Sequence, residues 1–341
     1  MKKAVFFTYT EYHLLTSYII QKEIANQYDL IKIYAIASEK RLNFDCNYQS
    51  SNCEIISVKM DSAELVDIIN KTINVGVEKV FIFNEDEPLM VYLMVKLKKT
   101  KIALVQDGLK PYTKVNKKHE FISTIRNTIS GYKSLFKFGL MLNSLYLFEI
   151  YKYASSKQIT EIWLTNPESF DNKFNKFIKT IPVLSNENTK IELFNIFRLN
   201  SEKALGYTSN VIFYVHQALP YDEFKVEEMN LLKDLRIKMG ENCKMYIKIH
   251  PLANIDLKNS FVRELNAEII ENMIPAELYI LQLKKSIVLS AWSTALLNNN
   301  LDCKFYYTMN LMPWNFAIKQ LNPYNPTQHI KTISSINQII F

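Results

Sequence analysis

Short apolar runs alternate with helical patterns along most of this chain, and that alternation restricts its fold more than any other feature. In the first half the pattern predicts five strands with helices between them, the strands at 3–8, 30–36, 80–83, 102–105 and 161–164 and the helices at 12–20 and 62–71. Strands separated by helical patterns are typical of a parallel, doubly wound sheet. We therefore expect an α/β fold.

A second series of the same kind begins near residue 211. It predicts strands and helices in turn, the strands at 211–215, 244–249, 268–270, 287–289 and 304–307 and the helices at 223–239 and 276–285. Between the two series, residues 182–201 include a polar run and are expected to form a linker. A chain of 341 residues favours two domains. We expect one domain over 1–190 and another over 205–341.

The composition is that of a soluble globular protein, with 48% hydrophobic and 22% charged residues. The uncharged apolar stretch at 138–148 is too short to span a bilayer, and the apolar run at the N-terminus is too short for a secretory signal. We expect a cytoplasmic protein. Its four cysteines are expected to be free thiols, although the sequence leaves a disulfide between Cys46 and Cys53 open.

Motifs for common cofactors and metals are missing from the sequence. It contains neither Gly-x-Gly-x-x-Gly nor a Walker pattern, which disfavours dinucleotide and ATP binding. Four histidines lack a partner three or four residues away that would mark a metal site, namely His13, His119, His216 and His329. The acidic run at 85–87 lacks Asp-x-Asp spacing and is interpreted as a solvated loop. We expect no metal site.

Three short motifs each follow a predicted strand. They are Val-Gln-Asp-Gly at 105–108, Lys-Ile-His-Pro at 248–251 and Ser-Thr-Ala-Leu at 293–296. In open α/β sheets, ligands bind at the carboxyl ends of the strands. Together the motifs supply a carboxylate, an imidazole and a pair of hydroxyls, which are the groups needed to move a sugar from a nucleotide to a hydroxyl.

The carboxylate of the first motif is Asp107, at the end of a strand. It can accept a proton from an attacking hydroxyl, and Gly108 permits a tight turn behind it. The alternative is that Asp-Gly serves only as a turn, which is its commonest use. The presence of the other two motifs favours the catalytic interpretation.

The other two motifs offer groups for a phosphate. Pro251 restricts His250 to an extended backbone, and a cationic imidazole there can neutralise or protonate a departing phosphate. Ser293 and Thr294 open a predicted helix, where hydroxyl and backbone N–H groups bind anions. The alternatives are a structural histidine and a plain helix cap, which needs only one hydroxyl.

Two further sets of residues are weaker candidates. Glu277, in the first turn of a predicted helix, can accept bonds from ribose hydroxyls or simply complement the helix dipole. Tyr9, Thr10 and His13 follow the first strand and can contact an acceptor or the donor sugar.

Basic and apolar residues are crowded into one stretch of the first half. The basic ones suit a face toward anionic lipid or an anionic glycan better than nucleic acid, for which no motif is present; they are Lys110, Lys114, Lys117, Lys118, Arg126, Lys133 and Lys137. Residues 121–153 add an apolar face. That face lies either on a membrane surface or against the N-terminal domain, and the sequence leaves both open.

The ordered motifs resemble those of bacterial sialyltransferases and polysialyltransferases, a group similar to glycosyltransferase family 52. Members carry an acidic-Asp-Gly, a His-Pro and a Ser-Ser/Thr motif on a GT-B fold, matched here by residues 106–108, 250–251 and 293–294. Lys248 agrees with a Lys-x-His-Pro form, and Glu277 agrees with a ribose-binding glutamate between the last two motifs. The N-terminal Thr-Glu-Tyr-His-Leu-Leu at 10–15 and Gln217, at a Gly-Gln-Pro-like turn, extend the similarity.

This resemblance implies a GT-B fold with two Rossmann-like domains facing a central cleft, the first for the acceptor and the second for a CMP-sugar donor. It implies that Asp107 is the general base and that His250 assists the departure of CMP. The remaining residues would bind the donor, with Lys248 and the main chain near Pro251 at the cytosine, Glu277 at the ribose and Ser293 with Thr294 at the phosphate. Gln106 departs from the family, which commonly has Asp or Glu there.

We therefore expect an inverting, metal-independent sialyltransferase that needs no cofactor. It would pass sialic acid from CMP-sialic acid to a terminal galactose-type hydroxyl of lipooligosaccharide or capsular polysaccharide. Two alternatives stay open, namely another donor (CMP-Kdo, another CMP-nonulosonate or a UDP-sugar) and a non-catalytic glycan- or lipid-binding protein. The expected partners are the donor, a glycan acceptor and the inner face of the cell membrane, without nucleic acid. The sequence leaves a homodimer open.

Overall fold

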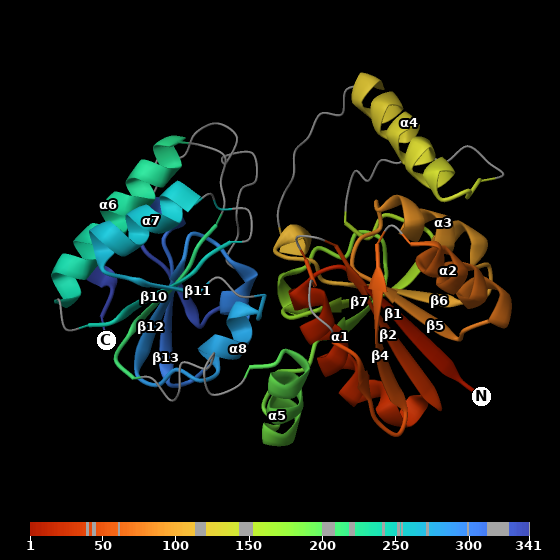
Figure 1. Cartoon of the computed structure of the whole chain (residues 1–341), viewed down its shortest axis with the longest axis horizontal. Coiled ribbons are helices and arrows are strands. Elements are labelled where there is room, and N and C mark those ends of the chain that lie inside the picture. The colour runs from red at the N-terminus through yellow and green to blue at the C-terminus, as the bar shows by residue number, and fades with distance from the viewer. Residues whose placement is uncertain are drawn as a thin grey trace. The chain divides into compact units, whose positions relative to one another are not determined.

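The chain divides into two compact units, Met1–Pro182 and Val183–Phe341. The computed structural model describes all residues except 39–40, 43–45, 61, 113–120, 143–152, 200–208, 218–221, 241–242, 251–252, 254, 271–272, 299, 312–326 and 341, with the backbone alone for 121–124 and 222–223. Both units are α/β (Figure 1).

The first unit contains an eight-stranded sheet. Its strands, in spatial order, are β3 (Tyr48–Gln49), β4 (Cys53–Lys59), β2 (Leu30–Ala37), β1 (Lys3–Thr8), β5 (Lys79–Ile82), β6 (Lys101–Val105), β7 (Ile159–Leu164) and β8 (Phe177–Thr180). All neighbours pair in parallel except β3 with β4. From β4 to β7 this is the Rossmann order 3-2-1-4-5-6.

Helices cover both faces of this sheet, because successive strand residues point to opposite sides. Val5 and Phe7 face a core shared with α2 (Ala63–Val75) and α3 (Pro88–Lys96), and α4 (Phe121–Lys137) adds Leu135 to it. Phe6 points the other way, where it stacks on Phe81 at 4.0 Å between ring centroids. Figure 1 shows α1 (Glu11–Ile24) away from α2 and α3, on that second side.

The second unit contains a six-stranded, wholly parallel sheet. Its strands, in spatial order, are β11 (Glu268–Ile270), β10 (Met245–Lys248), β9 (Ile212–Val215), β12 (Ser286–Ser290), β13 (Cys303–Tyr307) and β14 (Ile330–Thr332). Numbered from β9, this is again the order 3-2-1-4-5-6. Both units are therefore Rossmann-like and doubly wound, as the sequence predicts.

The helices of the second unit also lie on both faces of its sheet. Tyr214 and Ile247 face a core with α6 (Asp222–Met239) and α7 (Ile255–Leu265). On the other face, Phe213 stacks on Tyr279 of α8 (Ala276–Ile280) at 6.3 Å between centroids. Short 3-10 turns complete both units, at Ala25–Gln27, Lys110–Tyr112, Pro167–Ser169, Thr294–Leu297, Met309–Leu311 and Ile336–Gln338.

Several details differ from the sequence predictions. The helix predicted at 276–285 is shorter than expected: α8 ends at Ile280, and turns lead from there to β12. The predicted linker contains α5 (Glu187–Ile196), whose polar start is a helix cap: the Asn186 side chain accepts the backbone N–H of Thr189 at 3.1 Å. The sequence analysis also missed six further helices and strands, namely β3, β4, β8, β14, α3 and α7. All four cysteines are free thiols.

Candidate active site

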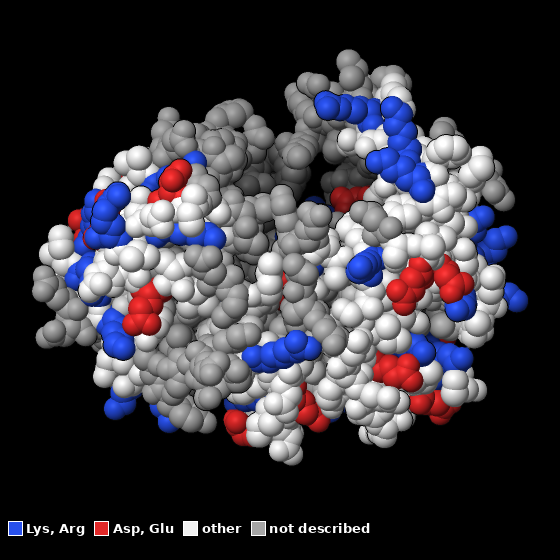
Figure 2. All heavy atoms as spheres, in the orientation of Figure 1, with Lys and Arg blue, Asp and Glu red and all other residues white. Residues whose placement is uncertain are grey.

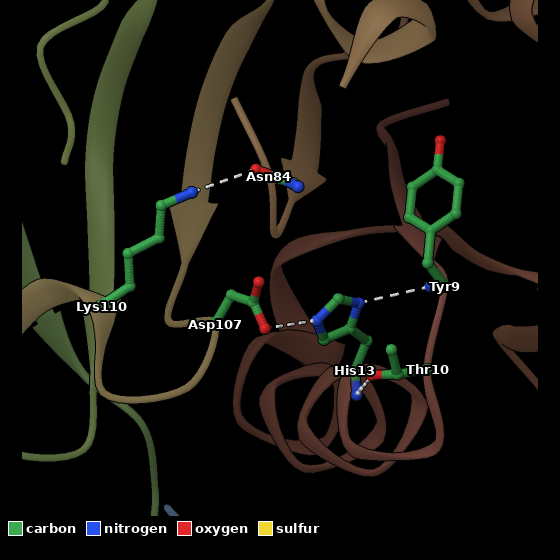
Figure 3. Close-up of polar contacts among 6 residues, drawn as sticks. All are labelled: Tyr9, Thr10, His13, Asn84, Asp107 and Lys110. Carbon is green, nitrogen blue, oxygen red and sulfur yellow. Dashed lines mark hydrogen bonds and ion pairs between the residues drawn. The ribbon is translucent and has the colours of Figure 1, made fainter. Parts of the chain in front are cut away.

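The strand order of the first unit reverses between β1 and β5, and ligands of doubly wound sheets bind beside such a reversal, at the carboxyl ends of the strands. Three of the residues that follow β1, β5 and β6 are His13, Asn84 and Asp107. Figure 3 shows the His13 and Asp107 side chains directed toward one another, and the Lys110 side chain directed toward Asn84. Sequence positions almost 100 residues apart therefore meet at this edge of the sheet.

His13 and Asp107 form the central contact of this group. The Nε2 atom of His13 lies 3.0 Å from Oδ1 of Asp107, and the Nδ1 atom accepts the backbone N–H of Tyr9 at 3.3 Å (Figure 3). Because Nδ1 accepts, the ring proton belongs on Nε2 and is donated to the carboxylate. The imidazole is buried and stacks on Phe83 at 4.0 Å between centroids, which fixes its orientation.

The Asp107 carboxylate is held in its ionised form. Burial, the largest single influence, raises its pKa, but the hydrogen bond from His13 and the positive charges of Lys110 and Arg41 outweigh it. The pKa of Asp107 therefore lies below its usual value. The Asp107 side chain keeps 37% of its surface exposed, so the carboxylate is ionised near neutral pH and still accessible to a ligand.

The two residues beside Asp107 have structural roles. Gly108 has φ +63, and a Cβ there would meet nothing within 4 Å, so glycine is required by the backbone conformation rather than by space. Gln106 is fully buried, and its Oε1 accepts three bonds, from the Tyr112 hydroxyl and from the backbone N–H and hydroxyl of Thr165. One carboxylate oxygen could accept the same three bonds.

Lys110 and two other predicted residues complete the group. The Lys110 Nζ donates to Oδ1 of Asn84 at 3.3 Å (Figure 3). It also lies 3.5 Å from Oδ2 of Asp86. Tyr9 donates its hydroxyl to Glu87 at 3.2 Å, and Thr10 caps α1 by accepting the His13 backbone N–H at 3.1 Å. Tyr9 and Thr10, which the sequence predicts to contact an acceptor or the donor sugar, thus already have hydrogen-bond partners within the first unit.

The interpretation of residues 85–87 as a solvated loop is wrong. Glu85 is 1% exposed and accepts the backbone N–H groups of Ala154 at 2.6 Å and Ser156 at 3.4 Å. Burial raises its pKa to about 7. Glu87 caps α3 by accepting the Met90 N–H at 2.9 Å. Glu85 and Glu87 therefore accept hydrogen bonds from backbone N–H groups. Only Asp86 is exposed to solvent, as the prediction of a solvated loop requires.

In the second unit, the order reverses between β9 and β12, and most of the predicted residues lie near this reversal. His250 and Gln217 follow β10 and β9 by one residue each, after Ile249 and His216. The His250 backbone N–H is donated to Nδ1 of His216 at 3.3 Å. Gln217 is half-buried, and Pro251 lies outside the described residues.

The Ser-Thr motif is tied to the same central strand. Ser290, the last residue of β12, donates its hydroxyl to the Val215 carbonyl at 2.8 Å and accepts the Ser293 N–H at 3.1 Å. The Ser293 hydroxyl caps the following 3-10 turn by accepting the Ala295 N–H at 3.2 Å. Within the described part of the chain, the half-buried Thr294 hydroxyl makes no hydrogen bond, so it can bind a ligand.

Lys248 and Glu277 form an electrostatic pair in this unit. Glu277 is 6% exposed at the start of α8, and burial raises the pKa of its carboxyl to about 7, opposed by its own backbone N–H and by the charge of Lys248. A carboxyl in this state can donate as well as accept hydrogen bonds near neutral pH. Such a group suits sugar hydroxyls.

Sequence reasoning considered His216 only as a metal ligand, which its spacing disfavoured, and did not single out Glu228. The two lie 3.5 Å apart and are buried, and the Tyr214 hydroxyl donates to Glu228 at 2.6 Å. His216 directly follows β9, so its place at a strand end is the signal that could have found it. Glu228 lies within a long helix, where its burial cannot be read from the sequence.

A family model describing alpha-2,8-polysialyltransferases matches residues 4–302, which include all three motifs. This chain belongs to the alpha-2,8-polysialyltransferase family. It is therefore a glycosyltransferase of the sialyltransferase class, as the resemblance of its motifs predicts. A search of curated proteins finds no significant match.

Solved structures similar to this family member are distant in sequence. One is the GT-B domain of a sialyltransferase from Photobacterium damselae, with 13% identity and a TM-score of 0.47, covering 90% of this chain and 91% of that one. Another is the E. coli ADP-heptose LPS heptosyltransferase II, with 10% identity and a TM-score of 0.45, covering 98% and 90%.

The described residues were also compared with what a metal site and a membrane span require. Among them, no group of three or more His, Cys, Asp or Glu side chains is arranged to hold a metal ion. Within the same part of the chain, none of the helices combines the length and apolar character that a membrane span requires.

Proposed function

We propose that this chain is an inverting sialyltransferase that uses CMP-sialic acid and needs no metal or cofactor. The acceptor is a terminal galactose-type hydroxyl of lipooligosaccharide or capsular polysaccharide. The observation that carries the proposal is the family match over residues 4–302, because it includes Asp107, His250 and Ser293. Each of these residues lies at a place where doubly wound sheets bind ligands.

In the first unit, Asp107 takes the proton of the acceptor hydroxyl. As that oxygen forms its bond to the anomeric carbon of sialic acid, the bond from this carbon to the phosphate oxygen breaks. A single displacement of this kind inverts the anomeric centre. The lowered pKa of Asp107 keeps the carboxylate ready to accept near neutral pH, and general bases typically contribute about 10²–10⁴-fold to rate.

In the second unit, the polar groups hold the leaving nucleotide. His250 and the Thr294 hydroxyl stabilise the negative charge that grows on the phosphate. Lys248, with the main chain that follows it, binds the cytosine, and Glu277 binds the ribose hydroxyls. CMP carries a single phosphate, so protein groups suffice to neutralise it and no divalent cation is required.

Nucleotide binding tests the donor assignment. A ligand present at about 100 times its dissociation constant adds about 2.7 kcal/mol to the stability of the protein that binds it. We expect CMP to raise the unfolding temperature, UDP and ADP to leave it unchanged, and Glu277→Ala to weaken the effect of CMP. Stabilisation by UDP but not by CMP would contradict a cytidine donor.

We also propose that the protein contacts an anionic membrane surface through α4. Ile125, Ile129 and Phe136 of α4 are exposed and recur at spacings that place them on one helical face. The described basic residues of the helix are Arg126, Lys133 and Lys137, and its sequence contains no Asp or Glu. Figure 2 shows Lys and Arg side chains gathered over α4. This combination is typical of interfacial helices.

Vesicle sedimentation tests the membrane contact. We expect the protein to bind vesicles containing phosphatidylglycerol, to bind pure phosphatidylcholine weakly, and to lose most of its binding in a Phe136→Ser, Lys137→Glu variant. Ile237→Ser is the matched control, because Ile237 is 80% exposed on α6. Equal binding by the α4 variant and the control would contradict the proposal.

A further inference from the structure

His216 contacts both ends of the Lys248–His250 segment. Its backbone N–H is donated to the Lys248 carbonyl at 3.1 Å, which continues the pairing of β9 with β10. Its side-chain Nδ1 accepts the His250 N–H at 3.3 Å. One buried residue at the end of the central strand therefore fixes the backbone on which Lys248 and His250 are presented.

The protonation state of His216 follows from these contacts. Because Nδ1 accepts a backbone N–H, the single ring proton lies on Nε2, which faces Oε2 of Glu228 at 3.5 Å. Burial, together with the charge of His250, lowers the pKa of His216 to about 3. His216 is therefore neutral near pH 7 and remains a hydrogen-bond acceptor for His250.

The surroundings of His216 prevent its ring from turning away. The ring meets Phe261 of α7 edge-on, with centroids 5.7 Å apart and an interplanar angle of 72°. Glu228 on α6 is fully buried and is itself held by the Tyr214 hydroxyl at 2.6 Å. Both covering helices and the central strand thus determine where Nδ1 lies.

We propose that His216 is a positioning residue, which holds the His250 backbone so that the His250 imidazole stays beside the departing phosphate. This inference rests on the proposed role of His250 in CMP departure. His216 does not contact the substrate in this scheme. It acts through the hydrogen bond to the His250 N–H, and removal of that bond frees the turn that follows β10.

Two substitutions separate this role from simple packing. His216→Leu removes the acceptor, whereas His216→Asn places its Oδ1 atom where Nδ1 lies and retains the acceptor. A misplacement of about 1 Å can cost about 10²-fold in rate. We expect His216→Leu to lower kcat about 10- to 100-fold with little change in the acceptor KM, and His216→Asn to restore most of the loss.

Hydrogen–deuterium exchange of the full-length protein tests the contact independently of activity. We expect the His250 amide to be protected in the wild-type protein and in His216→Asn, and to exchange faster in His216→Leu. The thermal unfolding of both variants is measured in parallel, to show that each is folded. Activity is measured as sialic acid transfer from CMP-sialic acid.

Three results would overturn the inference. They are unchanged His250 exchange in His216→Leu, wild-type kcat in that variant despite faster exchange, and a folded His216→Asn as slow as His216→Leu. Absence of transfer by the wild-type protein would instead overturn the proposed function. Exchange at His250 would still decide whether His216 holds that backbone.

Discussion

The Nε2 atom of His13 lies 3.0 Å from Oδ1 of Asp107, although the two residues are 94 positions apart in the sequence. His13 belongs to the first turn of α1 and Asp107 to the turn after β6, so the contact joins two strand ends near the reversal of strand order. Its consequence is electrostatic, because the hydrogen bond favours the ionised form of the carboxyl group.

Loss of the His13 hydrogen bond should move the pH dependence of transfer. In His13→Phe the carboxylate loses a donor, so the pKa of Asp107 rises and the base becomes ionised only at higher pH. We expect the acidic limb of the kcat/KM profile to shift to higher pH. His13→Gln can still donate an N–H and should shift it less. An unchanged acidic limb in His13→Phe would contradict the role given to this pair.

Replacement of the base itself should remove most of the activity. Asp107→Asn keeps the shape of the side chain but cannot accept the proton, so we expect kcat to fall by about 10²–10⁴-fold. Asp171→Asn is the control, because Asp171 lies on the surface of the same unit, paired with Lys173 at 2.7 Å. Substantial transfer by a folded Asp107→Asn protein would remove Asp107 as the base.

Much of the fold could be predicted from the sequence because buried parallel strands are short apolar runs. The strand at Lys3–Thr8 and the one at Glu268–Ile270 have the predicted bounds. Strand β8 escaped prediction because it lies at the sheet edge, where Phe177 is 62% exposed and no apolar run forms. Helix α5 was taken for a linker because capping residues and linker residues are of the same types.

From the sequence, a site residue could be predicted only where it belongs to a recognisable motif directly after a single strand. Asp107 and His250 fulfil that condition, and their roles remain predictions until they are measured. The partners that orient them come from other elements, namely His13 from the first turn of α1 and His216 from the end of β9. Such pairing depends on strand order, which a single sequence does not specify.

Gln106 should tolerate a carboxylate but not an apolar side chain. Gln106→Leu leaves three donors of Tyr112 and Thr165 without their acceptor. An unsatisfied buried donor costs about 1–3 kcal/mol. Because the two Thr165 donors are only part-buried, we expect the free energy of unfolding to fall by about 1–3 kcal/mol. Gln106→Glu retains an acceptor oxygen and should cost less, as chemical denaturation can show. Equal stability of the two variants would contradict this account.

The buried Glu228 should make stability depend on pH. Burial raises its pKa from 4.5 to about 8, so the folded protein keeps a proton that the unfolded chain releases. Stability therefore falls as pH rises from about 4.5 to 8. Glu228→Gln cannot ionise, and its unfolding temperature relative to the wild type should rise over this range. Glu264→Gln, at an exposed site, is the control, and a pH-independent difference for Glu228→Gln would contradict the assignment.

Mass spectrometry of the products formed from CMP-sialic acid tests the central claim most directly. The acceptor panel includes lactose and an oligosaccharide that already ends in sialic acid, so that first transfer and chain extension are distinguished. We expect the wild-type protein to add sialic acid to an acceptor in the presence of EDTA, and Asp107→Asn to form at most traces of product. Transfer from another nucleotide sugar but not from CMP-sialic acid, or equal product from Asp107→Asn, would contradict the account.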